Sequence, residues 1–241
     1  MKISIIMPVY NEIATIAEVI QKVLEVPIEG SKELVIVDDH SDDGTRDYLQ
    51  KLVRRETLQE AHLQGKEEML KIVFHDRNLG KGGAIETAIA YVTGEIILIQ
   101  DADLEYDPRD YAALLQPLLE GKADVVFGNR FHGGPHRVLY FWHYLGNRFL
   151  TTLCNIVTNL NLTDMEVGYK VFRSDIIKQI RIHSRRFGFE PEITIKLAKL
   201  RCRIYEVPIS YHGRTYAEGK KIGWKDGLAA FFHILRYRFF D

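Results

Sequence analysis

Short apolar runs alternate with longer segments of helical periodicity over the first 130 residues. The runs predict strands at Ile3–Met7, Leu34–Val37, Lys71–His75, Ile96–Gln100 and Asp124–Gly128. Apolar residues at helical spacing predict intervening helices over Ile13–Val26, from about Arg46, over Gly83–Val92 and over Tyr111–Leu119. Runs of four to six apolar residues separated by helices are typical of parallel strands buried on both faces. The pattern therefore predicts an α/β fold with helices flanking a mostly parallel sheet.

The second half has a different pattern. Phe141–Leu160 carries an apolar stripe at helical spacing, Arg203–Ile209 resembles a strand, and Trp224–Phe240 forms a terminal amphipathic segment. The stripes are Trp142, Leu145, Phe149, Leu153, Ile156 and Leu160, then Trp224, Leu228, Phe231, Leu235 and Phe239. We interpret both stripes as core. Contact with a membrane surface is the alternative, because His233, Arg236 and Arg238 stand beside phenylalanines.

Composition is typical of a soluble globular chain of 241 residues with a formal net charge of -1. That charge does not favour nucleic acid as a partner. The two cysteines, Cys154 and Cys202, are far apart and indicate a reducing compartment. With no signal peptide and no apolar run of membrane-spanning length, we expect a cytoplasmic location, with peripheral membrane association as the alternative. The polar segment 54–68 is expected to be a solvated helix or loop.

An acidic cluster follows the fourth predicted strand. Asp101, Asp103, Glu105 and Asp107 fall within seven positions. Alternate residues of an extended chain share a side, so Asp101 and Asp103 are expected to converge, and Glu105 joins them if the extended geometry persists. Oxygen ligands without nearby His or Cys favour Mg²⁺ or Mn²⁺, and magnesium usually keeps phosphate oxygens in its shell. Asp107, before a proline, is expected to cap the next helix.

Four motifs in order resemble glycosyltransferase family 2, whose members have the A-type nucleotide-sugar-binding fold. They are Met7-Pro8-Val9-Tyr10-Asn11-Glu12, Val37-Asp38-Asp39 through Thr45, Asn78-Leu79-Gly80-Lys81-Gly82-Gly83-Ala84, and Asp101-Ala102-Asp103-Leu104-Glu105. The segments Gly128–Phe131 and Arg214–Lys221 make the branch similar to the dolichyl- or polyprenyl-phosphate sugar synthases. The resemblance implies a single domain, residues 1–241, with a nucleotide-sugar-binding half at 1–130 and an acceptor-binding half at 131–241.

The resemblance also implies roles for individual residues. Tyr10 and Asp39 would contact the base, and Glu12 the ribose or base edge. The residues implied for nucleotide-sugar binding are Pro8, Tyr10, Glu12, Asp39, Lys81, Asp101, Ala102, Asp103, Arg214 and Lys220. Asp103 and Glu105 would hold the metal, and Gln often stands where this chain has Glu105. Arg214 and Lys220 would close over the diphosphate.

Arg130 follows a strand at the same edge and could bind a donor or an acceptor phosphate. With Asp101 and Asp103 it completes the expected catalytic set. Gly80-Lys81-Gly82-Gly83 lacks the full P-loop pattern, so a tight turn that feeds a helix is the alternative to nucleotide contact. Asp164 and Glu190 could serve as a base toward a hydroxyl acceptor, whereas a phosphate acceptor needs none.

The resemblance implies an inverting, metal-dependent glycosyltransferase that moves a sugar, mannose or glucose, from a GDP- or UDP-linked donor to a polyprenyl or dolichyl phosphate. Transfer to a sugar hydroxyl is the nearest alternative. Haloacid-dehalogenase-like phosphatases also carry Asp-x-Asp after a strand, but Glu105 stands where they place Thr or Val. A nucleotide-sugar sensor without catalysis is the third possibility.

Overall fold

The computed structural model describes residues 1–54, 69–131, 133, 135–186, 188–218 and 223–241. Its strands are β1 Lys2–Val9, β2 Ser31–Asp38, β3 Leu70–Phe74, β4 Ile96–Ile99, β5 Val125–Asn129, β6 Lys170–Arg173 and β7 Ile204–Pro208. Its helices are α1 Ile16–Glu25, α2 Thr45–Val53, α3 Gly80–Ile89, α4 Tyr111–Leu119, α5 Phe141–Thr158, α6 Ser174–Ile177, α7 Phe189–Lys199 and α8 Trp224–Phe239. The predicted polar segment 54–68 lies, except for Arg54, outside the described residues.

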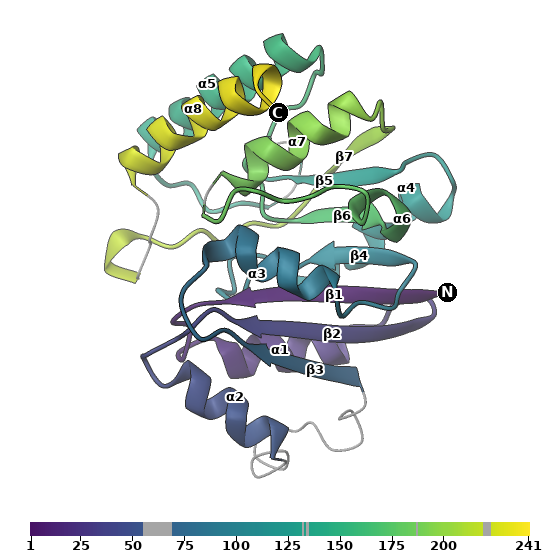
Figure 1. Cartoon of the computed structure of the whole chain (residues 1–241), viewed down its shortest axis with the longest axis vertical. Helices are drawn as coiled ribbons and strands as arrows, with labels where there is room; N and C mark the ends of the chain where they lie inside the picture. The colour runs from purple at the N-terminus through teal and green to yellow at the C-terminus, as the bar shows by residue number, and fades with distance from the viewer. Residues whose placement is uncertain (55–68, 132, 134, 187, 219–222) are drawn as a thin grey trace.

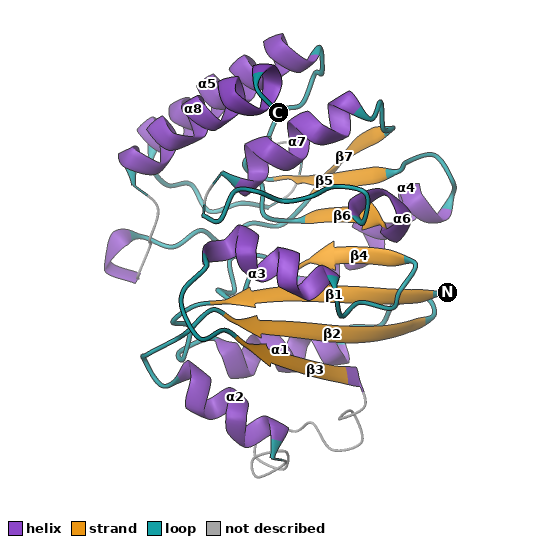
Figure 2. Cartoon of the chain, in the orientation of Figure 1, coloured by secondary structure: helices purple, strands orange, loops and turns teal. Residues whose placement is uncertain are grey.

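The strands form one mixed, mostly parallel sheet, as predicted (Figure 2). Their order in the sheet, for which the sequence made no prediction, is β3-β2-β1-β4-β6-β5-β7. The neighbouring strands β1 to β4 all run parallel, and β7 is parallel to β5. Among the strands that the structure describes, only β6 is antiparallel to its neighbours, and the sequence pattern did not predict it. Lys170-Val171-Phe172-Arg173 has two apolar residues between two charged ones, too few to signal a strand.

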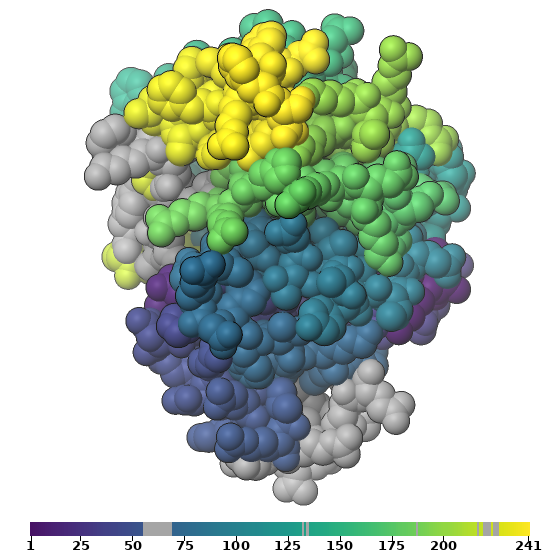
Figure 3. All heavy atoms as spheres, in the orientation of Figure 1, coloured from purple at the N-terminus to yellow at the C-terminus, as the bar shows by residue number. Residues whose placement is uncertain are grey.

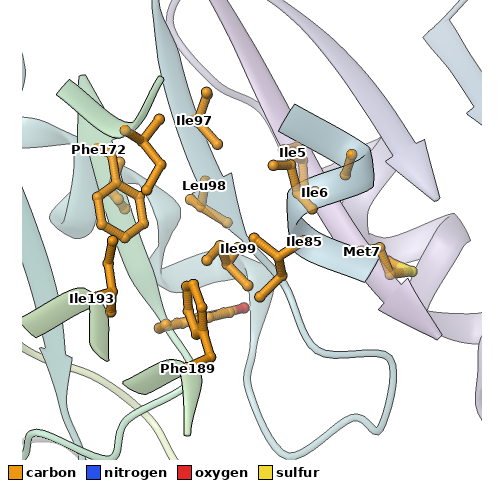
Figure 4. Close-up of a cluster of buried hydrophobic side chains, with 14 of the residues drawn as sticks. Ile5, Ile6, Met7, Ile85, Ile97, Leu98, Ile99, Phe172, Phe189 and Ile193 are labelled. Atoms are coloured by element: carbon orange, nitrogen blue, oxygen red, sulfur yellow. The ribbon is translucent and has the colours of Figure 1, made fainter. Parts of the chain in front are cut away.

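The core is built around β1 and β4, whose residues are buried on both faces. Figure 4 shows Ile5 and Ile6 of β1 beside Ile97 to Ile99 of β4, with Ile85 of α3 packed between them. Phe189 and Ile193 of α7 come from the second half of the chain and join the same cluster (Figure 4). Helix α3 lies on one face of the sheet and α1 on the other (Figure 1).

The predicted core stripes of α5 and α8 are wrong for most of their members. The buried side chains of α5 are Leu150, Thr151 and Cys154, and those of α8 include Ala230, Ile234 and Tyr237. Trp142, Leu145, Phe149, Ile156, Leu228 and Phe239 are instead exposed. Both helices carry apolar residues on more than one face, so periodicity alone does not select the face that packs inward. Within the described residues, no helix is long and apolar enough to cross a bilayer.

The glycines at the start of α3 have a packing role. A Cβ on Gly82 would lie 1.9 Å from the carbonyl oxygen of Ser184, and one on Gly80, whose φ is +79°, 1.9 Å from that of Arg185. The Gly82 amide donates a hydrogen bond to Arg185 O at 3.1 Å. The Gly-Lys-Gly-Gly run therefore lets the segment before α7 pack directly against the start of α3. This close packing places the side chain of Lys81 between α3 and α7.

Replacing Gly82 with alanine should destabilise the fold, because the new methyl group meets a backbone carbonyl that has little room to move. We expect a loss of about 1–3 kcal/mol in the free energy of unfolding, measured by urea denaturation. Gly146→Ala in α5 is the matched control. Its Cβ meets nothing within 4 Å, and the substitution should stabilise the helix by about 0.5–1 kcal/mol. Equal stability of Gly82→Ala and the native chain would refute the packing role.

Candidate active site

Three strand ends meet at one edge of the sheet. Because β1, β2 and β4 are parallel neighbours, the residues that follow them lie along the same rim, where open α/β sheets bind ligands. One residue in each following turn has a left-handed backbone: Asn11 (φ 53°), His40 (φ 65°) and Leu104 (φ 61°). Such conformations cost free energy in residues other than glycine and concentrate at functional sites. The turn at Leu104 directly separates Asp103 from Glu105.

The expected extended geometry of the acidic cluster is wrong. Strand β4 ends at Ile99, and the left-handed Leu104 breaks the alternation that would have placed Asp101, Asp103 and Glu105 on one side. The carboxylates pair with two different cations. Asp101 bonds to Lys81, whereas Asp103 and Glu105 share Arg214. Asp107 caps the following turn, as predicted, by accepting a hydrogen bond from the Arg109 amide at 2.9 Å.

Arg214 joins the cluster to the second half of the chain. Its Nε donates to Glu105 Oε1 at 3.1 Å, its Nη2 to Asp103 Oδ2 at 3.0 Å and its Nη1 to Glu12 Oε2 at 3.3 Å. The Tyr211 hydroxyl donates to the other oxygen of Glu105 at 2.9 Å. Arg214 and the three carboxylates of Glu12, Asp103 and Glu105 thus form one ion-pair network, which we call the charged node. Arg214 lies more than one hundred positions from each of the three in sequence. Figure 1 shows the segment that ends at Tyr216–Glu218 on the side toward which β1, β2 and β4 point.

Lys81 forms a second node. Its Nζ lies 3.0 Å from Asp101 Oδ1 and 3.0 Å from Glu190 Oε1, so it links the first carboxylate of the cluster to α7. Burial works against its charge, but Asp101 and Glu190 together raise the pKa of Lys81 well above its usual value. Gly168 closes in from the other side, since a Cβ there would lie 2.2 Å from Asp101 Oδ2. Asp101 is therefore held by Lys81, which Glu190 of the second half also binds, and is packed against Gly168.

Arg130 is locked to Asp164. Its Nε and Nη2 donate to the two oxygens of Asp164, each at 2.7 Å, and Asn147 donates to the same carboxylate at 3.1 Å. Asp164 is fully buried, and the Arg130 side chain is 12% exposed. The guanidinium carbon lies 5.2 Å from the ring centre of Tyr211, which is within cation–π distance. Arg130 is thus fixed beside the segment that carries Arg214.

Asp39 stabilises the start of α3. It is buried and accepts hydrogen bonds from the amides of Leu79 and Gly80 and from the His75 ring, all at 2.7 Å. Those amides are otherwise unpaired donors of the first helical turn. The contact of Asp39 with a base stays a prediction. The loop end of β1 is more open, since Tyr10 is 42% exposed, while Ala102 is buried and its carbonyl accepts from Thr15 Oγ1 at 2.7 Å. Lys220 lies outside the described residues.

Several ionisable groups in this region have shifted pKa values. Burial, with the nearby charges of Glu105 and Asp101, raises the pKa of Asp103 to about 7. Burial and the Glu190 charge raise the pKa of Glu166 to about 8, and its Oε1 has no hydrogen-bond partner among the described residues. Burial lowers the pKa of Lys170 to about 8. Lys170 was not predicted, because it is a charged residue in an unpredicted strand. Its Nζ donates to the carbonyls of Met165 and Val167.

The donor atoms suit a hard divalent cation. Asp103 and Glu105 offer only oxygen, their side chains are 18% and 14% exposed, and the positive Arg214 already lies among them. Burial is the main cause of the raised pKa of Asp103, and the nearby charges of Glu105 and Asp101, which a cation would offset, add to it. As the described side chains stand, no three His, Cys, Asp or Glu converge into a closed metal cage. The two carboxylates could hold a metal that completes its shell with water and phosphate.

Solved structures with a similar fold include several of one enzyme. Glucosyl-3-phosphoglycerate synthase from Mycobacterium tuberculosis, in complex with Mn²⁺, UDP and glucosyl-3-phosphoglycerate, has a TM-score of 0.72 and 19% identity. The match covers 98% of this chain and 79% of that one. Its complex with Mg²⁺ and UDP has a TM-score of 0.71 at 20% identity, with the same shares covered. At this identity the comparison shows the shared glycosyltransferase A-type fold.

Curated relatives include two that act on polyprenyl phosphates by name. The dodecaprenyl-phosphate galacturonate synthase of Rhizobium johnstonii is 27% identical over 227 residues, which cover 91% of this chain and 62% of that protein. The undecaprenyl-phosphate mannosyltransferase of Micrococcus luteus is 28% identical over 241 residues, covering 92% of this chain and 88% of that protein. The glycosyltransferase AglJ of Haloferax volcanii is 27% identical, covering 97% of this chain and 71% of that protein.

The sequence model of "Glycosyl transferase family 2" matches residues 4–181, from the first strand to beyond β6. The match includes every predicted motif of the first half and the segment that carries Asp164 and Gly168. The chain belongs to glycosyl transferase family 2.

Proposed function

We propose that this chain is an inverting, metal-dependent glycosyltransferase that moves a hexose, mannose or glucose, from a nucleoside diphosphate to a polyprenyl or dolichyl phosphate. The observation that carries the proposal is the charged node at the end of β4, where Asp103, Glu105 and Glu12 surround one guanidinium. Family membership and the names of the relatives support the reaction class and the lipid acceptor.

The donor lies along the rim in this proposal. Tyr10 and Asp39 contact the base, Pro8 and Glu12 line the nucleotide pocket, and Asp101 and Ala102 contact ribose and phosphate, with Lys81 nearby. Asp103 and Glu105 hold Mg²⁺ or Mn²⁺. That ion would stabilise the negative charge that develops on the departing diphosphate. Arg214 and Lys220 supply further positive charge to the same leaving group.

The pairing of Arg130 with Asp164 favours a phosphate acceptor. Both carboxylate oxygens of Asp164 accept hydrogen bonds from Arg130, and one of them also accepts from Asn147. Asp164 is therefore poorly placed to remove a proton from a hydroxyl. A phosphate oxygen is already anionic and attacks the sugar carbon without a base. Arg130 has a remaining guanidinium nitrogen, Nη1, with which it could hold that phosphate.

Glu190 supports the alternative acceptor, a sugar hydroxyl. It is buried, and in the part of the chain that the structure describes its Oε2 has no hydrogen-bond partner. Lys81 and Lys170 overcome the effect of burial and hold the pKa of Glu190 below its usual value. An ionised carboxylate with a free oxygen could act as a base.

A thermal-shift panel tests the proposed donor and metal. Ligands that bind only the folded state raise its melting temperature through linkage, by about 2.7 kcal/mol of stability at one hundred times the dissociation constant. We expect UDP or GDP, or one of their sugars, to stabilise the chain in the presence of Mn²⁺ and much less with EDTA. Asp103→Asn should abolish the metal-dependent part. The absence of any stabilisation by either nucleotide would contradict the proposal.

Substitutions of the two carboxylates separate the acceptor classes. For a phosphate acceptor, Asp164→Asn and Glu190→Gln should both keep measurable turnover, with a raised acceptor KM for Asp164→Asn because Arg130 loses its charged partner. Breaking this buried pair should also destabilise the fold by about 3 kcal/mol. If either variant binds donor normally but loses all turnover, the hydroxyl acceptor is supported instead.

The exposed aromatic side chains of α5 and α8 are proposed to rest on a membrane surface. Figure 3 shows α8, in yellow, against α5 at one end of the molecule. Phe149 of α5 stacks on Phe231 of α8, with ring centres 6.5 Å apart, beside a groove whose other lining residues are Gly146, Leu150, Gly227 and Leu228. The exposed arginines Arg148, Arg236 and Arg238 give this face a positive border suited to anionic lipid headgroups.

Vesicle flotation tests this surface. We expect the chain to float with vesicles that contain anionic phospholipid, and less so at high salt because arginine attraction is screened. Trp142→Ser combined with Phe149→Ser should reduce flotation severalfold. The control Tyr91→Ser removes an aromatic side chain that is 47% exposed, compared with 59% for Phe149. This control should float as well as the native chain. Equal flotation of all three proteins would exclude this face as the contact.

A further inference from the structure

Arg214 lies where the proposed metal would bind, and this arrangement has consequences for the order of binding. We propose, on the basis of the metal-dependent function above, that Arg214 is an internal cation that excludes a free metal ion. A divalent ion then enters only together with a diphosphate, which takes the guanidinium away from the carboxylates. The arginine thereby makes metal and nucleotide bind as a unit.

The hydrogen bonds account for the oxygens that a metal would use. Glu105 Oε1 accepts from both the backbone amide and the Nε of Arg214, at 3.1 Å each, while Oε2 accepts from Tyr211. Asp103 Oδ2 accepts from Arg214 at 3.0 Å, and Oδ1 from the Glu105 amide at 3.1 Å. Every carboxylate oxygen of the two proposed metal ligands therefore already accepts a hydrogen bond, and three of these four oxygens accept it from the segment 211–214.

Electrostatic repulsion disfavours binding of a divalent ion while the Arg214 guanidinium remains between the carboxylates. A divalent ion bound to Asp103 and Glu105 would lie within a few ångströms of the guanidinium, at a side chain that is only 19% exposed. Solvent screens such a repulsion weakly at a partly buried site. Removing Arg214 without a replacement is equally unfavourable, because Asp103, Glu105 and Glu12 would be left without their shared positive partner.

A diphosphate resolves this exchange. Its oxygens offer the planar guanidinium a bidentate partner of the kind that arginine prefers, and they also enter the coordination shell of the metal. Hydrogen bonds that do not involve the Arg214 side chain also anchor the backbone around it. The His212 amide donates to the Glu105 carbonyl, and Arg137 bonds to Gly213 O and Glu218. The side chain of Arg214 can therefore change partners while the segment stays in place.

The proposal implies positive coupling between metal and nucleotide, in which each raises the affinity for the other by the same factor. The coupling belongs to Arg214 and should be largely lost when its charge is removed. The matched control is Arg203, which forms a bidentate pair with Asp124 away from the site. Arg214→Gln and Arg203→Gln remove the same charge from the full chain.

Mn²⁺ binding measured by electron paramagnetic resonance tests the proposal, with Mn²⁺ alone and then with saturating UDP or GDP. We expect Arg214→Gln to bind Mn²⁺ alone about tenfold more tightly than the native chain, as expected when a close like charge is removed from a partly buried site. Arg203→Gln should match the native chain. Nucleotide should tighten Mn²⁺ binding strongly in the native chain and much less in Arg214→Gln.

Melting temperatures guard against a variant that merely folds poorly. Without Arg214 the carboxylates repel one another, so Mn²⁺ alone should raise the melting temperature of Arg214→Gln more than that of the native chain. If Arg214→Gln binds Mn²⁺ alone no more tightly than the native chain, the inference is overturned while the proposed function stands. If no protein binds Mn²⁺ with or without either nucleotide, both are overturned.

Discussion

The concentration of negative charge after β4 is the constraint on which the site depends. Asp101, Asp103 and Glu105 follow a fully buried strand, and burial together with mutual repulsion raises the pKa of Asp103 to about 7. Two cations offset that charge, Lys81 from the start of α3 and Arg214 from the second half. The fold can hold the acidic cluster at the edge of its sheet only because both cations reach it.

The second half of the chain completes the site as well as the fold. Glu190 of α7 fixes Lys81, Gly168 lies against Asp101, and Asp164 fixes Arg130. Each of these residues acts on a residue of the rim and positions it. In the proposed reaction, Arg130 binds the acceptor phosphate and the carboxylates that follow β4 bind the sugar donor. We therefore expect a phosphate bound at Arg130 to lie close to the sugar.

The sequence was sufficient to predict the parallel strands and the rim, because buried parallel strands leave long apolar runs and their ends carry the motifs. It failed where tertiary contacts override local pattern. Strand β6 has only two apolar residues, and its buried Lys170 contacts the ring of Phe127 in the neighbouring strand β5 as well as two carbonyls of the preceding segment. The side chains that pair with the cluster could not be predicted either, since Glu12 and Arg214 are 202 positions apart. The prediction of which faces of α5 and α8 pack inward was wrong, because apolar residues occur around both helices.

The proposed transfer is tested most directly by product analysis. The full chain would be incubated with Mn²⁺, the nucleotide-hexose that stabilises it, and a short polyprenyl phosphate, and the lipid fraction would be analysed by mass spectrometry. We expect the lipid to gain the mass of one hexose residue, in equal amount to the nucleoside diphosphate released, and to gain none when Asp103 is replaced by asparagine. Release of nucleotide without a hexosyl lipid, or a hexosyl lipid that still forms with Asp103→Asn, would contradict the account.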